Sequence, residues 1–321
     1  MGNSFTAYAI KKILNAFFSI FLISVAIFLL VHIIPGDPVR AMLGYDADEA
    51  AVQAVRTRLN MDKPLVEQYF IWASNFLQGE FGTSLVLNKD IAELIWTRIP
   101  VSLAITIPSF IIANIIAIII GIISATKRGS FVDQFLTVCT TAFAGMPDFW
   151  IGIMLMFLFS VKLRWLPTMG YVSPLADFGE YVRHAALPVM VNTIVSFAWT
   201  SRQVRTSMLD VLNQDYIRTA RANGVPKNTI YYKHALRNTL VPIVTLLVIQ
   251  VRSLVGGSLL IEQIFSIAGM GRLIYTSVTG NDFLVIQAIT MIIAIFVIFC
   301  NLLLDFSYGL IDPRVRIGGK K

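Results

Sequence analysis

The sequence predicts an all-α integral membrane protein with six transmembrane helices. The chain of 321 residues is 56% hydrophobic and only 14% charged, whereas soluble domains are about 25% charged. Six stretches are apolar over the ~20 residues that a spanning helix needs. Lysines and arginines gather in alternate loops, as they do in chains that cross a membrane repeatedly.

The first predicted span lies near residues 9–34. Its apolar run, residues 13–34, is longer than the core of a secretory signal peptide, and no small-residue cleavage site follows it. We therefore expect an N-terminal segment, residues 1–34, that is retained as a transmembrane helix.

The next segment, residues 35–98, is long enough to fold on itself. Leu65, Tyr69, Trp72 and Phe76 recur at helical spacing and predict one apolar stripe. We expect a helical external loop at the outer mouth of the membrane core. Two roles stay open for it, packing on the membrane helices or contacting an external partner.

The membrane core is predicted to cover residues 99–311 and to be followed by a cytoplasmic tail, residues 312–321. Its five spans are expected near residues 99–125, 133–160, 185–207, 237–261 and 283–308. The second of these five is interrupted by Pro147 and Asp148.

The orientation follows from the positive charges. Most of the 26 lysines and arginines fall on one side if both termini are cytoplasmic, which is the arrangement that the positive-inside rule favours. The net charge of +7 is thereby explained without nucleic acid, which we do not expect as a partner.

A basic segment, residues 210–238, joins the fourth predicted span to the fifth. Asn213 or Asp215 is expected to cap a first helix. Gly224 then stands where a helix end favours positive φ, and Pro226 suits the first turn of a second helix. The pattern predicts a helix–turn–helix, which we call the elbow.

The first helix of the elbow has a small, mildly apolar face formed by Ile217, Ala220 and Gly224. Short helices are marginally stable alone in water. We therefore expect this face to dock into a groove of another protein.

The elbow resembles the coupling loop of permeases from ATP-binding-cassette (ABC) importers, whose motif is roughly Glu-Ala-Ala, three residues and Gly. Arg218-Thr219-Ala220 and Gly224 occupy its positions, so the acidic first residue is absent. The chain is also similar to the branch that imports dipeptides, oligopeptides, glutathione and nickel. That similarity rests on Pro-Gly-Asp-Pro at 35–38, Phe-Gly-Thr-Ser at 81–84, Met-Pro-Asp-Phe-Trp at 146–150, Trp-Leu-Pro at 165–167, Gly-Met-Gly-Arg at 269–272 and Asp-Pro-Arg at 312–314.

The resemblance implies a type I ABC importer permease fold in the bacterial cytoplasmic (inner) membrane. It also implies a second, homologous permease, two cytoplasmic ATPase subunits that bind the elbows of the two permeases, and an extracytoplasmic substrate-binding protein. The implied coupling residues are Asp215, Arg218, Thr219, Ala220, Arg221, Gly224, Val225, His234 and Arg237. The chain has no G-x-x-x-x-G-K-[ST] phosphate loop, so ATP and Mg are expected on the partners, and no cofactor is expected on this chain.

Asp148 and Arg252 are the ionisable residues deepest in the predicted spans. Such groups usually face a cavity or each other, so both are candidates for the translocation path. They could form an ion pair, or Arg252 alone could attract a substrate carboxylate. Glu262 and Asp282 are expected to be surface charges near the outer mouth.

Short peptides are the leading hypothesis for the cargo, and nickel, metal chelates and glutathione are alternatives on the same scaffold. A self-sufficient channel or a membrane enzyme is the alternative from a different class. No nucleophile elbow or metal-binding helix motif is found, so neither catalytic nor metal-ligating residues are expected. His234 is expected to hydrogen-bond locally within the elbow.

Overall fold

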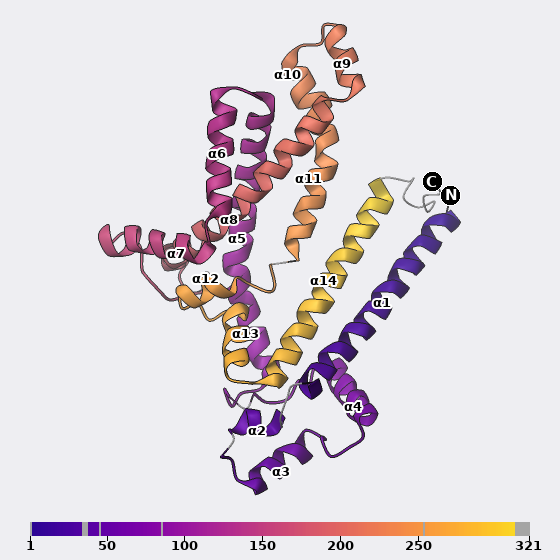
Figure 1. The fold of residues 1–321 in the computed structure, drawn as a ribbon, viewed down its shortest axis with the longest axis vertical. Coiled ribbons are helices and arrows are strands. Elements are labelled where there is room, and N and C mark those ends of the chain that lie inside the picture. The colour runs from indigo at the N-terminus through magenta and orange to yellow at the C-terminus, as the bar shows by residue number, and fades with distance from the viewer. Residues whose placement is uncertain (1, 34–37, 45, 85, 253, 312–321) are drawn as a thin grey trace. The chain divides into compact units, whose positions relative to one another are not determined.

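The computed structural model describes residues 2–33, 38–44, 46–84, 86–252 and 254–311 (Figure 1). In this part of the chain the regular elements are all helices, and Thr83 and Asp90 form one isolated bridge. The prediction of an all-α membrane protein is confirmed. Residues 35–37 of the Pro-Gly-Asp-Pro motif, the Asp-Pro-Arg motif and the predicted tail lie outside the described residues.

The α-helices follow one another with two π-helical stretches, η1 and η2, among them. They are α1 (Gly2–Ile33), α2 (Pro38–Leu43), α3 (Glu49–Arg58), α4 (Leu65–Gln78), α5 (Ile91–Thr126), α6 (Phe131–Gly145), α7 (Asp148–Met156), η1 (Phe157–Lys162), α8 (Phe178–Leu212), α9 (Asp215–Ala222), α10 (Lys227–Thr229), η2 (Ile230–Ala235), α11 (Leu236–Val251), α12 (Leu259–Ile264), α13 (Met270–Thr279) and α14 (Phe283–Ile311).

Within the described residues, four helical stretches are long and apolar enough to cross a membrane. They are Tyr8–Leu30, Ile91–Thr126, Lys227–Val251 and Phe283–Phe306. They correspond to four of the six predicted spans, and the chain is a multi-pass membrane protein.

The third predicted span, 133–160, is wrong as a single straight helix. α6 and α7 meet at an angle of 98°, with Pro147 capping α7. Because proline restricts the residue before it to extended conformations, Met146 leaves the helix with φ −85° and ψ 135°. This bent pair can count as a fifth span.

Two further predicted spans differ from the structure. The span predicted at 237–261 ends at Val251, and α12 is a separate helix. α8 covers the predicted span 185–207 and is 35 residues long, but it is not among the helices apolar enough to be counted. The count of six spans therefore stays a prediction.

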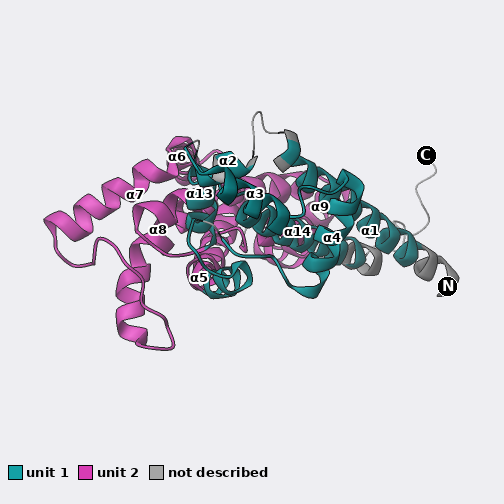
Figure 2. Ribbon diagram, turned by 90° about the horizontal axis from the view of Figure 1, so that it is seen from below, with its two compact units in different colours: residues 1–100, 270–321 teal, residues 101–269 magenta. Residues whose placement is uncertain are grey.

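The chain divides into two compact units (Figure 2). Unit 1 contains residues 1–100 and 270–321, and unit 2 contains residues 101–269, so that the division falls within α5. In unit 1, α1 runs beside α14 (Figure 1). Lys12 Nζ lies 2.8 Å from a carboxylate oxygen of Asp305, and Gln287 donates to the carbonyl of Ile27 at 3.3 Å.

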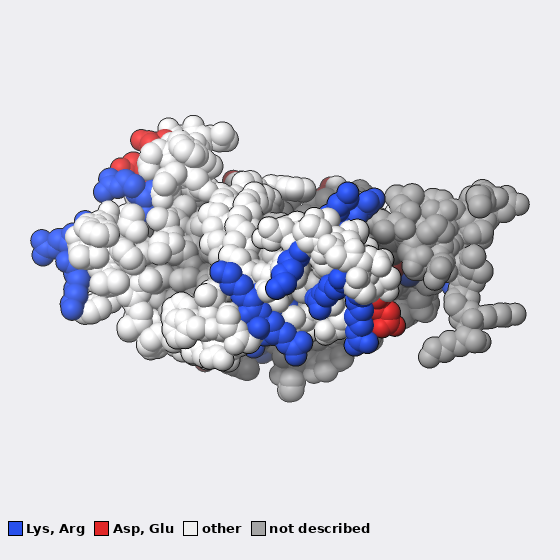
Figure 3. All heavy atoms as spheres, turned by 90° about the horizontal axis from the view of Figure 1, so that it is seen from above, with Lys and Arg blue, Asp and Glu red and all other residues white. Residues whose placement is uncertain are grey.

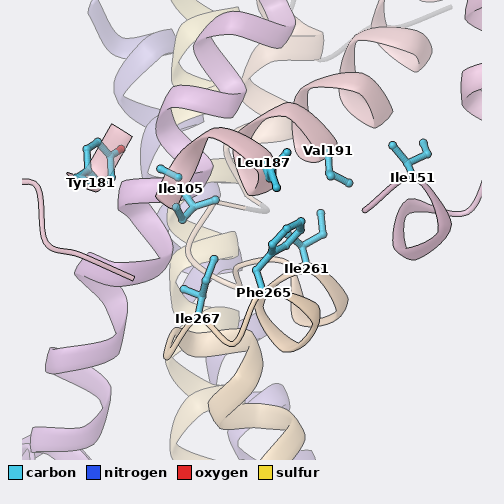
Figure 4. Close-up of a cluster of buried hydrophobic side chains, with 9 residues drawn as sticks. Ile105, Ile151, Tyr181, Leu187, Val191, Ile261, Phe265 and Ile267 are labelled. Carbon is cyan, nitrogen blue, oxygen red and sulfur yellow. The ribbon is translucent and has the colours of Figure 1, made fainter. Parts of the chain in front are cut away.

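The core of unit 2 is built where α5, α7, α8 and α12 meet. Leu187 and Val191 from α8 pack with Ile261 and Phe265 at the end of α12 (Figure 4), and all four are at most 2% exposed. Close to the elbow, α5 and α8 approach at Gly121, where a Cβ atom would lie 2.7 Å from the side chain of Val204. A small residue is required at this crossing, as is common between transmembrane helices.

Candidate functional site

The elbow is a helix–turn–helix, as predicted. α9 ends in a Schellman motif, in which Val225 N–H donates to Ala220 O at 3.1 Å and Gly224 N–H donates to Arg221 O at 3.0 Å. Gly224 has φ +75°, so the prediction of a positive φ is confirmed. The predicted cap is wrong, because Gln214 precedes the helix and makes no side-chain capping bond.

The inner face of α9 contacts its own chain. Ile217 is fully buried in a cluster with Met208 and Leu212 of α8 and Ile230 of η2, and Ala220 packs against the same cluster. The prediction that Ile217 and Ala220 form an external docking face is therefore wrong. Their apolar surface is used to fix the elbow to the ends of the long helices, which makes the elbow part of unit 2.

The outer face of α9 is polar, basic and exposed. Asp215, Arg218, Thr219, Arg221 and Gly224 are exposed on it, and the side chain of Arg218 is 75% exposed despite lying 3.6 Å from Asp215. Figure 3, which views the end of the molecule that carries α9 and α10, shows Lys and Arg gathered on this surface and few acidic groups. This face, rather than the apolar one, is available to a partner.

The second half of the elbow continues into the membrane. α10, η2 and α11 form one stretch, Lys227–Val251, that is apolar enough to span. Asn238 donates to the hydroxyl of Tyr216 at 2.6 Å and ties α11 to α9. The prediction that His234 forms a local hydrogen bond is wrong, because within the described residues its side chain has no hydrogen-bond partner. His234 lies in the π-helical stretch η2, a feature often found at functional sites.

A buried ion pair near the elbow gave no signal in the sequence. Asp133 of α6 is 4% exposed, and Arg205 of α8 donates to its two carboxylate oxygens at 2.9 Å each. Ser124 of α5 also donates to Asp133, and the Gly129 N–H does so at 2.9 Å. This cluster, the Asp133 clamp, joins α5, α6 and α8, and no spacing rule connects residues so far apart in the chain.

Unit 2 also contains a cavity of about 360 Å³, a volume in the range of small-molecule sites. Most of the residues that line it carry hydrogen-bonding side chains. The lining residues are Thr106, Ser109, Phe110, Asp148, Asn192, Val195, Ser196, Trp199, Thr200, Gln250, Leu254, Gly257 and Ser258. Among these described residues Asp148 alone is ionisable.

The side chain of Gln250 is held in place beside this cavity. It accepts from Asn114 at 3.1 Å and donates to Thr200 at 2.9 Å. Gln250 therefore links α5, α8 and α11, and it presents a fixed polar group at the end of α11.

The two candidate path residues are placed differently. Asp148 is partly buried at the start of α7 and lines the cavity. Its carboxylate accepts a hydrogen bond from the backbone N–H of the next residue, Phe149, at 2.8 Å. Arg252 lies just past the end of α11 rather than inside a span, donates to Ile249 O at 3.2 Å, and does not line the cavity. In the part of the chain described, no ion pair joins Asp148 to Arg252.

Two acidic residues expected on the surface are buried. Glu262 is 2% exposed and accepts from Ser102 at 2.6 Å in unit 2. Asp282 is 1% exposed and accepts from Ser84 at 2.5 Å in unit 1. Carboxylates near chain turns look like surface charges in a sequence, and only the fold shows the hydroxyl groups that accompany them.

Comparison with known proteins places the chain among transport proteins. A family model described as a binding-protein-dependent transport system inner membrane component matches residues 117–317, and the model of the corresponding N-terminal part matches residues 5–106. The glutathione transport system permease protein GsiC of Escherichia coli (strain K12) is 38% identical over 309 residues, covering 96% of this chain and 98% of that protein. A putative peptide permease protein of Brucella suis biovar 1 (strain 1330) is 37% identical over 315 residues, covering 97% and 99%.

Proposed function

Because the chain belongs to the family of binding-protein-dependent transport system inner membrane components and is thus an ABC importer permease, we propose that its cargo is a short peptide. The related permeases are named for glutathione and for peptides. Glutathione is itself a small peptide, so both names point to the same cargo chemistry of amide groups with charged ends.

The energy for transport is proposed to come from partners. Two cytoplasmic ATPase subunits that use ATP and Mg would bind the elbows of this chain and of the second permease, while this chain binds no cofactor. The exposed face with Arg218, Arg221 and Gly224 supports this proposal, since a bare glycine beside basic side chains leaves room for a close contact. A second, homologous permease and an extracytoplasmic substrate-binding protein would complete the importer.

The cavity of unit 2 is proposed to be this chain's share of the translocation path. The observation that carries the proposal is its lining, in which several hydroxyl and carboxamide side chains share the cavity with the single carboxylate of Asp148. Polar residues at membrane depth are costly unless they face a cavity or a pathway. Hydroxyl and carboxamide groups suit the peptide bonds of a cargo, and Asp148 suits its amino end.

Asp148→Asn is expected to lower the uptake of a dipeptide with a free amino end about ten-fold, because a hydrogen bond to a charged group contributes ~1.5 kcal/mol. The assay is uptake of a radiolabelled dipeptide into proteoliposomes that hold the complete importer. Asp148→Glu keeps the charge and should retain more uptake than Asp148→Asn. Wild-type uptake by Asp148→Asn would remove Asp148 from the path.

Both termini and the elbow are proposed to lie in the cytoplasm, in a bacterial inner membrane. The positive charges of the elbow support this orientation. Cysteines placed at Asp48 and Asn228 of a cysteine-free chain are therefore expected to react with an impermeant maleimide from opposite sides of the membrane. Labelling from the same side would contradict the orientation.

Co-purification tests the proposed assembly. A tagged chain is expected to retain a second, homologous permease and ATPase subunits when it is solubilised gently from its host. The purified chain alone should hydrolyse ATP no faster than a buffer control. Recovery of a self-contained homo-oligomer that conducts solutes without ATPases would favour a channel instead.

A further inference from the structure

Helix α4 in unit 1 carries two apolar stripes. The first was predicted as Leu65, Tyr69, Trp72 and Phe76. It faces the chain from Tyr69 onward, where the ring of Trp72 lies 5.9 Å from that of Phe28 in α1, whereas Leu65 is 51% exposed. The second stripe contains Val66 and Leu77, which are 69% and 86% exposed. The helical spacing of Leu65, Tyr69, Trp72 and Phe76 predicts only the first stripe.

The second stripe is continuous along the helix. Val66, Phe70, Ala73 and Leu77 follow one another at spacings of three and four residues, which places them on one side of a helix. Phe70 is 65% exposed. Since Tyr69 and Trp72 lie next to this stripe around the helix, about half of the circumference of α4 is apolar.

The contacts of Tyr69 place α4 at the depth of the membrane. Its hydroxyl is 2.8 Å from the hydroxyl of Ser24, and its ring lies 6.3 Å from that of Phe21. Both partners belong to the span Tyr8–Leu30. Ser24 is six residues from the end of this span, which is roughly 9 Å at 1.5 Å per residue, while half of the hydrocarbon core is about 15 Å thick.

The side of α4 that is opposite the first stripe and next to the second is polar. Glu67, Ser74 and Gln78 share it; Lys63 lies 2.9 Å from Glu67, and Gln78 donates to Ser74 at 3.0 Å. The start of the helix is also fixed to α1, because the carboxamide of Gln68 lies 3.1 Å from the Nε2 atom of His32. An apolar half, a polar half and a fixed depth are the properties of a helix that lies in a membrane interface.

We propose that α4 lies in the lipid leaflet at the Leu30 end of α1, with Val66, Phe70 and Leu77 among the acyl chains. Lipid is the occupant that continuity favours, because α1 presents Phe21 and Leu22 to the outside, each at least 50% exposed, beside the residues that hold α4. Its polar side then faces the headgroups. The helix is an anchor in the bilayer rather than a docking site for an external protein.

Spin labels at adjacent positions test this proposal. Single cysteines replace Leu77 or Val66 on the apolar stripe, and Gln78 or Glu67 on the polar side, in a full chain whose Cys139 and Cys300 are changed to alanine. The chains are studied with their partner subunits in lipid nanodiscs. Collisions of the label with oxygen, which concentrates in lipid, are compared with collisions with a water-soluble nickel chelate.

The ratio of oxygen to chelate accessibility is expected to be several-fold higher at Leu77 than at Gln78, and higher at Val66 than at Glu67. Low accessibility to both reagents at Leu77 and Val66 would mean that protein covers the stripe and would overturn the proposal. High chelate accessibility there would place the stripe in water and would also overturn it. Equal ratios within each pair would show that α4 does not have the proposed orientation.

Discussion

Gly224→Val is expected to reduce transport strongly while leaving the chain folded and inserted. Gly224 has φ +75°, and among the described residues no atom beyond Gly224 and its two chain neighbours lies within 4 Å of the position that a Cβ would take. Valine therefore costs the isolated chain only the backbone strain, ~1 kcal/mol. At a close contact with an ATPase it should cost about 2 kcal/mol more, roughly a 30-fold loss of binding.

The measurement combines peptide uptake with the amount of ATPase that the tagged permease retains. Lys227→Ala, an exposed change in the same turn, should behave like wild type. Gly224→Asn separates the two causes, because asparagine tolerates positive φ but adds bulk. If Gly224→Val transports normally and retains its ATPases, Gly224 is not at the contact.

Asp133→Asn is expected to have the largest effect on stability. It removes the negative charge that two hydrogen bonds from Arg205 neutralise. Breaking a buried ion pair costs about 3 to 5 kcal/mol, and we expect the lower end, ~3 kcal/mol, because Arg205 is partly exposed. The melting temperature of the purified chain in detergent should fall accordingly.

The double variant Asp133→Asn with Arg205→Met provides the matched control. It removes both charges and should recover part of the loss, since no unpaired guanidinium remains. An unchanged melting temperature in Asp133→Asn would show that the clamp does not hold α5, α6 and α8 together.

The sequence predicts what depends on local pattern. Apolar length identified four spans, and the positive φ of Gly224 followed from a glycine that precedes a valine and a proline. The interruption at Pro147 also appeared in the sequence, but its size did not: a bend of 98° is set by the packing of α7 against α8 and α12, which no local rule contains.

Contacts between distant segments could not be predicted. Ile217 was predicted to dock because the sequence of a short helix identifies its apolar face but not the residues that cover that face. The side chains of α8 that bury Ile217 lie elsewhere in the sequence. Glu262 and Asp133 likewise have partners that only the fold brings near. The cavity beside Asp148 combines residues from four helices and the segment after α11, so the sequence could nominate Asp148 but not its neighbours.

Site-specific cross-linking tests most directly whether the outer face of the elbow contacts the ATPases. A photoactivatable cross-linker is attached to a cysteine at Asn223, which is exposed at the end of α9, in membranes that hold the complete importer. Arg128, exposed in the turn before α6, carries the same cross-linker as the control. We predict a product between Asn223 and an ATPase subunit, identified by mass spectrometry, that is several-fold stronger than any product from Arg128. Equal yields at the two positions, or no ATPase product at Asn223, would contradict the account.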